Sequence, residues 1–356
     1  MIFLQEIVGN SRSAAAQWDD VRRGRDAFTA HESQHAAAMR AAGLHVNDGL
    51  IPTEVYQEFD NVTVERFRSD DGDTFLNDLL PMSRSVNIGR LVHKFRRASD
   101  AGQTQTSMTG QIGVKMDQVE YSYDGSLIPV HDTGFYRNWR EWNAQRAEGF
   151  DALIDDQRES VAALRRRLAD NFLDGHKDKN GQYLVLDAIS WQGMRNDSRV
   201  AQVDIGALGI NFDFTDTTKT YEQIEAAFKQ VRDVLWITNN CEKDATYYIS
   251  REIASNLERN SSEYASSENK IINRLSGLMG VAGIKTSSKL SGNEFMAFPL
   301  DGSSVRPIVG MGINTVAMPR PVYNSNYEFV VWGATGFEIR TDYSNRKCAL
   351  FAQELT

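Results

Sequence analysis

The segment 84–130 restricts the possible folds of this chain more than any other feature. Two β-rich stretches, SVNIGRLVHKF (85–95) and GQIGVKMDQVEYSY (110–123), flank the polar stretch RRASDAGQTQTSMTG. This alternation around a polar turn predicts one long two-stranded hairpin. Two strands alone bury too little apolar surface to be stable in water. The chain must therefore adopt a fold in which something else supports the hairpin.

The segment 135–173 carries the longest helical pattern. A helix of that length is about 50 Å long, which suits a spine running along an elongated domain. Gly175 is placed to end it as a C-terminal cap. One apolar stripe runs along the predicted helix: Trp139, Trp142, Phe150, Ile154, Val161, Leu164, Leu168 and Phe172.

The remaining segments mix helices and strands. Strands are predicted near 182–189 and 200–214, and Thr220 with Gln223 forms a capping box that begins the next helix. ATYYIS (245–250) is typical of a buried strand, and from 283 onward short strands alternate with turns. The sequence therefore predicts an α+β fold.

Residues 11–42 predict a polar helix with a narrow apolar seam that includes Trp18 and Phe28. The seam is too thin for a core helix, so we expect an arm that lies on another surface. The rising strand of the hairpin is basic and contains no acid. Either it is a solvated edge that discourages strand aggregation, or it docks against an acidic neighbour. Its basic residues are Arg84, Arg90, Lys94, Arg96 and Arg97.

The totals exclude several classes of protein. A chain of 356 residues favours two packed regions, and a net charge of −9 argues against a surface built to grip nucleic acid throughout. We find no secretory signal and no apolar run long enough to span a bilayer. Cys241 and Cys348 are the only cysteines, and we expect two free thiols, as suits a reducing cytoplasm.

HESQH at 31–35 matches the H-E-x-x-H zinc-protease motif. His31 and His35 would bind zinc one helical turn apart, and Glu32 would be the general base. A third ligand is required, yet Ala41 stands where the extended motif has histidine; Glu54 or Glu58 would serve on spacing alone. Because the helix resembles a surface arm, we favour a chance match.

Two glycine-rich stretches do not complete a nucleotide-binding motif. GLMGVAGIKTSS separates Gly283 from Lys285, and VGMGINT lacks the third glycine of a dinucleotide loop. No Gly-x-Ser-x-Gly elbow presents a serine. We expect no catalytic, cofactor or metal site, and hence no enzyme.

The order of these segments resembles the major capsid proteins of tailed bacteriophages, which have the Hong Kong 97-like fold. The resemblance covers essentially the whole chain. It is carried by GLIPTEVYQEFDNVTVERFRSDDGDTFLNDLL before the hairpin and SLIPVHDTGFYRNWREW leading into the spine. Near the end it is carried by KLSGNEFMAFPLDGSSVRPIVGMGINTVAMPRP and YEFVVWGATGFEIRTDYSNRKCALFAQEL.

The resemblance implies a division of the chain into named parts. Residues 1–50 would be the N-terminal arm, 51–83 a connecting segment and 84–130 the extended loop, lying over a neighbouring subunit. Residues 131–219 and 336–356 would form the peripheral domain, with the spine helix at 135–173. Residues 220–335 would form the axial domain, which gathers around five- and six-fold axes.

The resemblance also implies partners. The chain would assemble with itself into pentamers and hexamers of an icosahedral shell around double-stranded DNA, bound without sequence specificity. Portal, separate scaffolding and possible decoration proteins would join it in the virion, assembled in the host cytoplasm without a membrane. Cross-linking through Lys94 or Lys115 is not expected. The basic strand, together with the seam residues Trp18 and Phe28, would make subunit contacts, and the strand would face four acids of an adjoining spine: Asp151, Asp155, Asp156 and Glu159.

Two alternatives stay open. An encapsulin-like compartment would have the same fold and hold cargo enzymes. A zinc metalloprotease would use HESQH and contain about one zinc per chain.

Overall fold

The computed structural model divides the chain into two units, residues 1–65 and 66–356. It describes residues 74–354 apart from 110–112, 114–115, 148–151, 262–269 and 323, together with scattered positions between 19 and 41. Every described position of the first unit is helical and exposed. This agrees with the predicted polar helix at 11–42.

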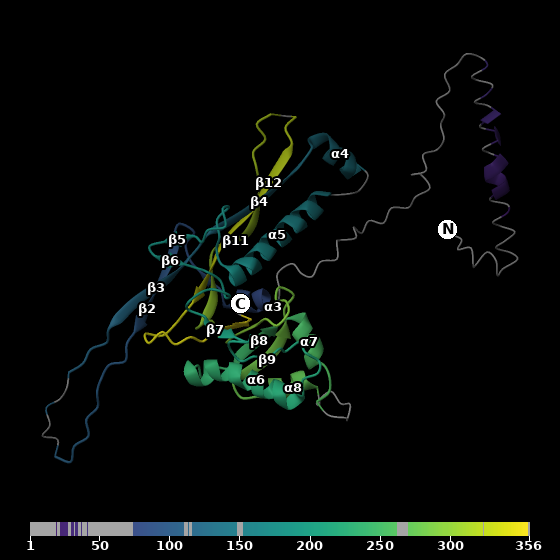
Figure 1. The fold of residues 1–356 in the computed structure, drawn as a ribbon. Coiled ribbons are helices and arrows are strands. Elements are labelled where there is room, and N and C mark those ends of the chain that lie inside the picture. Colours follow the sequence, from purple (N-terminus) through teal and green to yellow (C-terminus); the bar gives the residue numbers. More distant parts are fainter. Residues whose placement is uncertain are drawn as a thin grey trace. The chain divides into compact units, whose positions relative to one another are not determined.

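A five-stranded sheet forms the centre of one half of the second unit, in the order β7-β13-β10-β8-β9. One face is covered by helices α6 (Tyr221–Asp233), α7 (Arg251–Leu257) and α8 (Ile271–Ser276), and a π-helical turn, η3 (Val234–Thr238), continues α6 (Figure 1). The strands are β7 (Ala201–Asp204), β8 (Ala245–Ile249), β9 (Val281–Thr286), β10 (Phe295–Phe298) and β13 (Leu350–Gln353).

Both faces of this sheet are buried, which explains the unbroken apolar run in ATYYI. Tyr247 packs with Phe228 of α6 in the core under the helices, whereas Tyr248 points into a second core. Because neighbouring side chains of a strand point to opposite faces, a strand between two cores carries no polar alternation. The predicted capping box is confirmed, since the Thr220 hydroxyl accepts from Gln223 N and the Gln223 side chain accepts from Thr220 N.

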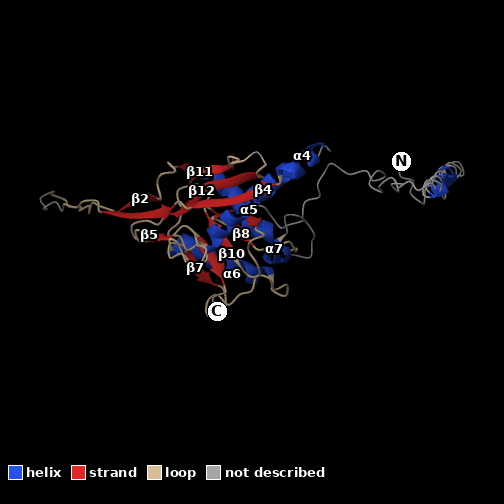
Figure 2. Cartoon of the chain, turned by 90° about the horizontal axis from the view of Figure 1, so that it is seen from above, coloured by secondary structure: helices blue, strands red, loops and turns tan. Residues whose placement is uncertain are grey.

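A four-stranded sheet in the order β1-β11-β12-β4 forms the other half. Helix α5 (Ala152–Asp174) lies along it, and Figure 2 shows α5 between the two sheets. The Phe172 ring of α5 contacts both sheets: its centroid lies 5.0 Å from the ring centroid of Phe337 in β12 and 5.8 Å from that of Phe298 in β10. The strands are β1 (Arg84–Ser85), β4 (Val130–Arg137), β11 (Val305–Ala317) and β12 (Tyr327–Ile339).

The spine helix begins later than predicted. Residues 130–137 form β4, which pairs with β12, and the Phe135 ring stacks on Phe329 at 5.0 Å. The two tryptophans of this segment have helical spacing, but strand pairing determines the conformation before them. Helix α4 (Trp139–Ala147) then precedes α5, with residues 148–151 outside the described part. The predicted cap is confirmed, because α5 ends at Asp174 and Gly175 has φ +87°.

The hairpin exists but is shorter than predicted. Strands β2 (Val92–Ala98) and β3 (Tyr121–Leu127) pair antiparallel, while Arg84 and Ser85 pair with β11 instead. The described residues between 99 and 120 form no strand, although 110–123 was predicted as one. Strand propensity depends on packing against neighbours, and that part of the hairpin has no core face in the chain.

The sheets also group the strands differently from the predicted domain boundaries. Most of β11 and β12 was assigned to the axial domain at 220–335, yet these strands pair with β4 beside α5. Conversely, β7 and β13 were assigned to the peripheral domain but lie in the sheet with β8 and β10. Sequence order does not decide which sheet a strand joins, because β12 pairs with β4 and β13 pairs with β7, and the strands of each pair are far apart in the chain.

The short elements connect these parts. Helix α3 (Thr74–Leu79) and the 3₁₀ turn η2 (Leu80–Met82) pack on the second core, and β5 (Val185–Leu186) pairs with β6 (Ile189–Ser190) beside β3. In place of the predicted strand at 182–189 the chain forms a small hairpin of two strands with two residues each. Within the predicted strand at 200–214, β7 is the one strand that forms.

Candidate functional site

The base of the hairpin is held by a buried carboxylate. Glu338 of β12 is fully buried, and its Oε1 accepts from Arg306 Nε at 3.0 Å and from Arg340 Nε at 2.6 Å. His93 Nδ1 of β2 lies 2.6 Å from the other oxygen. A glutamate is rarely buried without partners, and these three tie β2 to β11 and β12. The base of the hairpin is therefore rigidly joined to the sheet.

A second ionic group holds the other strand of the hairpin. Arg199 donates to both carboxylate oxygens of Asp197 and to the carbonyl oxygens of Gly125 and Ser190. It also lies 3.6 Å from Asp124 of β3. Burial opposes the charge of Arg199, but the hydrogen bonds that it donates to Asp197 and the nearby charges of Asp197, Asp124 and Glu338 together outweigh burial, so the pKa of the guanidinium is raised.

Gly125 permits this close packing. A Cβ atom there would lie 2.7 Å from the carbonyl oxygen of His93 and 2.9 Å from Ile189 Cδ1. A larger side chain would clash with the paired strand β2 inside the hairpin and with Ile189 of β6.

One face of the hairpin is exposed. Tyr121 and Tyr123 are 60% and 65% exposed, and Tyr123 lies opposite Arg96 in the register. The other face carries Phe95, which is buried under Arg340. Exposed aromatic rings beside cations are enriched at protein interfaces, so this face can bind another protein surface.

The predicted basic residues have different surroundings in the chain. Arg84, Arg90 and Arg96 are exposed. Lys94 lies 3.4 Å from Asp187, and Arg97 donates to Thr341 Oγ1 and Asn345 Oδ1.

Two of the predicted acids have partners in the same chain that lie outside the basic strand. Asp156 accepts two hydrogen bonds from Arg137, one of them 2.8 Å long, and Glu159 lies 3.6 Å from Arg166. Asp155 is half-buried on α5. Asp151 lies outside the described residues, as do Trp18 and Phe28. A contact between the basic strand and these acids of a neighbouring subunit stays a prediction.

The zinc-protease motif falls largely outside the described part: His31 is exposed on a helix, while Glu32 and His35 are not described. No group of histidine, cysteine, aspartate and glutamate suited to a metal occurs among the described residues. Of the helices that the structure describes, none has the length and apolarity to cross a membrane.

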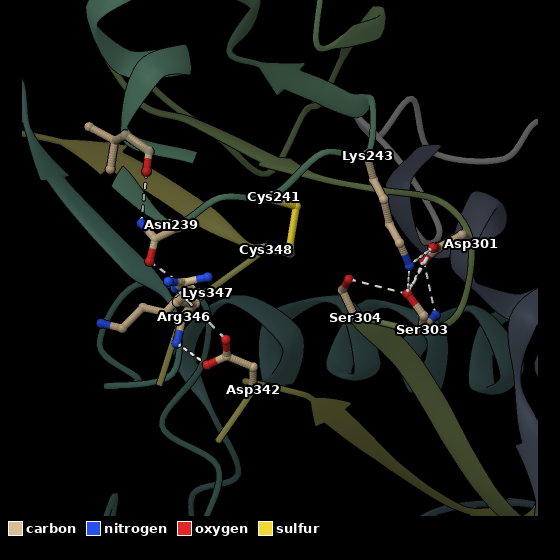
Figure 3. The surroundings of a disulfide bond; sticks show 11 residues. Asn239, Cys241, Lys243, Asp301, Ser303, Ser304, Asp342, Arg346, Lys347 and Cys348 are labelled. Carbon is tan, nitrogen blue, oxygen red and sulfur yellow. Dashed lines mark hydrogen bonds and ion pairs between the residues drawn. A yellow bond between two sulfur atoms is a disulfide. The ribbon is translucent and has the colours of Figure 1, made fainter. Parts of the chain in front are cut away.

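The expectation of two free thiols is wrong. Cys241, after η3, and Cys348, before β13, form a disulfide with Cα atoms 5.4 Å apart and a sequence separation of 107 (Figure 3). The spacing in sequence carried no sign of this. The backbone N–H of Lys347 donates to Asn239 Oδ1, and this bond places the two segments side by side.

His176 is a buried titratable group. It is 1% exposed, its ring lies 6.1 Å from that of Phe337, and neither ring nitrogen has a hydrogen-bond partner among the described residues. Burial lowers its pKa to about 3, with smaller effects from His131 and Arg167. The fold therefore holds His176 as a neutral side chain.

Stability is expected to fall as the pH falls from about 6.5 towards 3. In that window the unfolded imidazole binds a proton and the folded one does not. His176→Phe keeps a ring against Phe337. The free energy of unfolding of this variant should fall by about 2 kcal/mol less between pH 7 and pH 5 than that of the wild-type chain. Denaturant unfolding of the unassembled subunit at both pH values measures this. The exposed His31→Gln variant is the control, and an unchanged pH dependence in His176→Phe would contradict the assignment.

Glu338 and its partners were not predicted from the sequence. The available signal was an acid within the buried-type stretch VVWGATGFEIR, since a charge in such a strand requires a partner. The identity of the partners was not predictable, because His93 is 245 residues away in sequence.

A model of a family of unknown function, DUF6260, matches residues 41–352. Among proteins of curated function, none matches this chain.

Solved structures similar to this chain include capsids. The capsid of Myoviridae phage XM1 superposes with a TM-score of 0.63 at 12% identity, over 86% of this chain and 99% of that one. The capsid of an empty GTA particle superposes with a TM-score of 0.52 at 11% identity, over 88% of this chain and 100% of that one. The capsid of cyanophage P-SCSP1u superposes with a TM-score of 0.53 at 11% identity, over 88% of this chain and 97% of that one. The chain thus has the mixed α+β Hong Kong 97-like fold, and the predicted resemblance is confirmed at the level of fold.

Proposed function

The chain belongs to the family of unknown function DUF6260, and we propose that it is the major capsid subunit of a tailed phage. The observation that carries this proposal is the fold, because the superposition covers 99% of the phage XM1 capsid chain. In this proposal the subunit has a structural role: it forms pentamers and hexamers of an icosahedral shell that encloses double-stranded DNA. A portal protein, a separate scaffolding protein and possible decoration proteins complete the particle in the host cytoplasm.

The hairpin supports this proposal. Its base is fixed by Glu338 and Arg199, whereas the described residues between 99 and 120 project beyond the sheets without forming strands (Figure 1). A rigid base with an exposed aromatic face suits docking on a neighbouring subunit. The acidic net charge of −9 suits a lining that holds packaged DNA without binding its sequence.

Electron microscopy of the purified protein, with and without a candidate scaffolding protein, tests the proposal. Closed shells or rings of pentamers and hexamers are expected. Monomers under every condition would contradict it. Shells that contain cargo protein instead of DNA when isolated from the native source would favour the encapsulin-like alternative.

The double substitution Tyr121→Ala, Tyr123→Ala should impair assembly. Burying each ring at a subunit contact contributes about 1–2 kcal/mol. The subunit concentration for half-maximal assembly should therefore rise by more than about tenfold, as measured by light scattering. Leu208→Ala is the control, because this side chain is 91% exposed in the turn after β7. Equal assembly of the hairpin variant and this control would remove the hairpin face from the interface.

A further inference from the structure

A polar cleft of about 570 Å³ lies beside the base of the hairpin. Its walls come from three segments: β2 and β3, residues 188–199, and the turn 341–347. Ile189 is the one large aliphatic side chain of the lining. Pockets for small organic ligands are mostly apolar, so this cleft is unlike them. It resembles the polar part of a protein interface.

The charges of the cleft do not balance. It contains three cations, Arg97, Arg199 and Lys347, but two carboxylates, Asp124 and Asp197. Both carboxylates pair with the Arg199 guanidinium, Asp124 at 3.6 Å and Asp197 at 2.7 Å.

The other two cations have neutral partners. Arg97 donates to the Thr341 hydroxyl at 2.9 Å and to the Asn345 side-chain oxygen at 3.0 Å. Lys347 Nζ donates to the carbonyl oxygen of Val200 at 3.3 Å. Neither makes an ion pair with any residue that the structure describes.

These two cations are held in place by the same turn. Thr341, which binds Arg97, is the β-bridge partner of Lys347. Lys347 is next to Cys348, whose disulfide to Cys241 anchors the turn, and its backbone N–H binds Asn239 (Figure 3). Both side chains are half-buried, so little of their freedom is left to lose on binding.

We propose that this cleft receives a carboxylate side chain from a second copy of the chain, which pairs with Arg97 and Lys347. The proposal rests on the assembly proposed above and adds one of its contacts. A second copy is the suitable partner because the chain carries 48 acidic against 39 basic residues. The cleft also adjoins the hairpin, so the contact would be continuous with the proposed docking surface. A preorganised pair of cations in a polar cleft binds a carboxylate through charge-assisted hydrogen bonds.

Carbodiimide coupling of assembled particles tests this directly. The reagent joins a lysine amine to a carboxylate that it touches. Particles are grown from a mixture of ¹⁴N- and ¹⁵N-labelled subunits, so mass spectrometry separates links between subunits from links within one. A link from Lys347 to an acid of another subunit is expected. Particles in which Lys347 forms no link between subunits would overturn the proposal.

Two variants give an independent measurement. Arg97→Gln and Lys347→Gln should each raise the subunit concentration for half-maximal assembly by about tenfold, and added salt should reduce the difference. Arg346→Gln is the matched control, because it removes a charge from the same turn but from a residue paired with Asp342. Thermal unfolding of unassembled subunits shows whether each variant folds.

The results distinguish the two proposals. If the wild-type chain forms no particles, the proposed capsid function fails and the cleft contact with it. If wild-type particles form and the folded Arg97→Gln and Lys347→Gln subunits assemble as well as Arg346→Gln, the cleft contact alone is wrong.

Discussion

Glu338→Gln is expected to lower the free energy of unfolding by about 3–5 kcal/mol, because removing one partner of a buried ion group leaves charges without compensation. The Arg306 and Arg340 side chains are 14% and 30% exposed, so water cannot fully replace the carboxylate. Burial already lowers the pKa of Arg306 despite the nearby Glu338. Glutamine keeps the shape and one acceptor oxygen but removes the negative charge.

Urea unfolding of the unassembled subunit measures this difference. Glu328→Gln is the matched control, since Glu328 lies exposed on the same strand and should change the free energy by less than about 0.5 kcal/mol. A loss in Glu338→Gln no larger than in the control would show that the arginines find other partners. The loss should also appear as greater exposure of β2 amides to hydrogen exchange, because His93 links that strand to Glu338.

Local signals in the sequence predicted local structure well. The Thr220–Gln223 capping box, the Gly175 cap and the buried strand at 245–250 were correct because each depends on residues a few positions apart. The start of the spine helix was wrong because β12, almost 200 residues later, draws 130–137 into a sheet. A helical spacing of tryptophans does not contain that information.

The candidate site depends mainly on such distant pairings. The exposed cations of the hairpin were visible in the sequence, but the pairing of Arg97 with Thr341 spans 244 residues. Likewise, only the folded chain distinguishes Arg199, whose charge Asp124 and Asp197 compensate, from Lys347, whose charge they do not. Sequence predicts which charges exist, whereas the fold determines which remain to bind a partner.

Reduction of the Cys241–Cys348 disulfide is expected to lower the free energy of unfolding by about 4–5 kcal/mol on the chain-entropy model, since the bond closes a loop of 107 residues. Cys241 is 3% exposed, so the bond reduces slowly in the folded subunit and should be broken under mild denaturant. Urea unfolding with and without dithiothreitol measures the change. The Cys241→Ser, Cys348→Ser variant is the control, because its unfolding should not respond to the reductant.

Thiol labelling under denaturing conditions should find no free cysteine before reduction and two afterwards. Two labelled thiols without reductant would restore the original expectation from the sequence, and the hydrogen bond from Lys347 N–H to Asn239 would still join the turn at 341–347 to the end of η3.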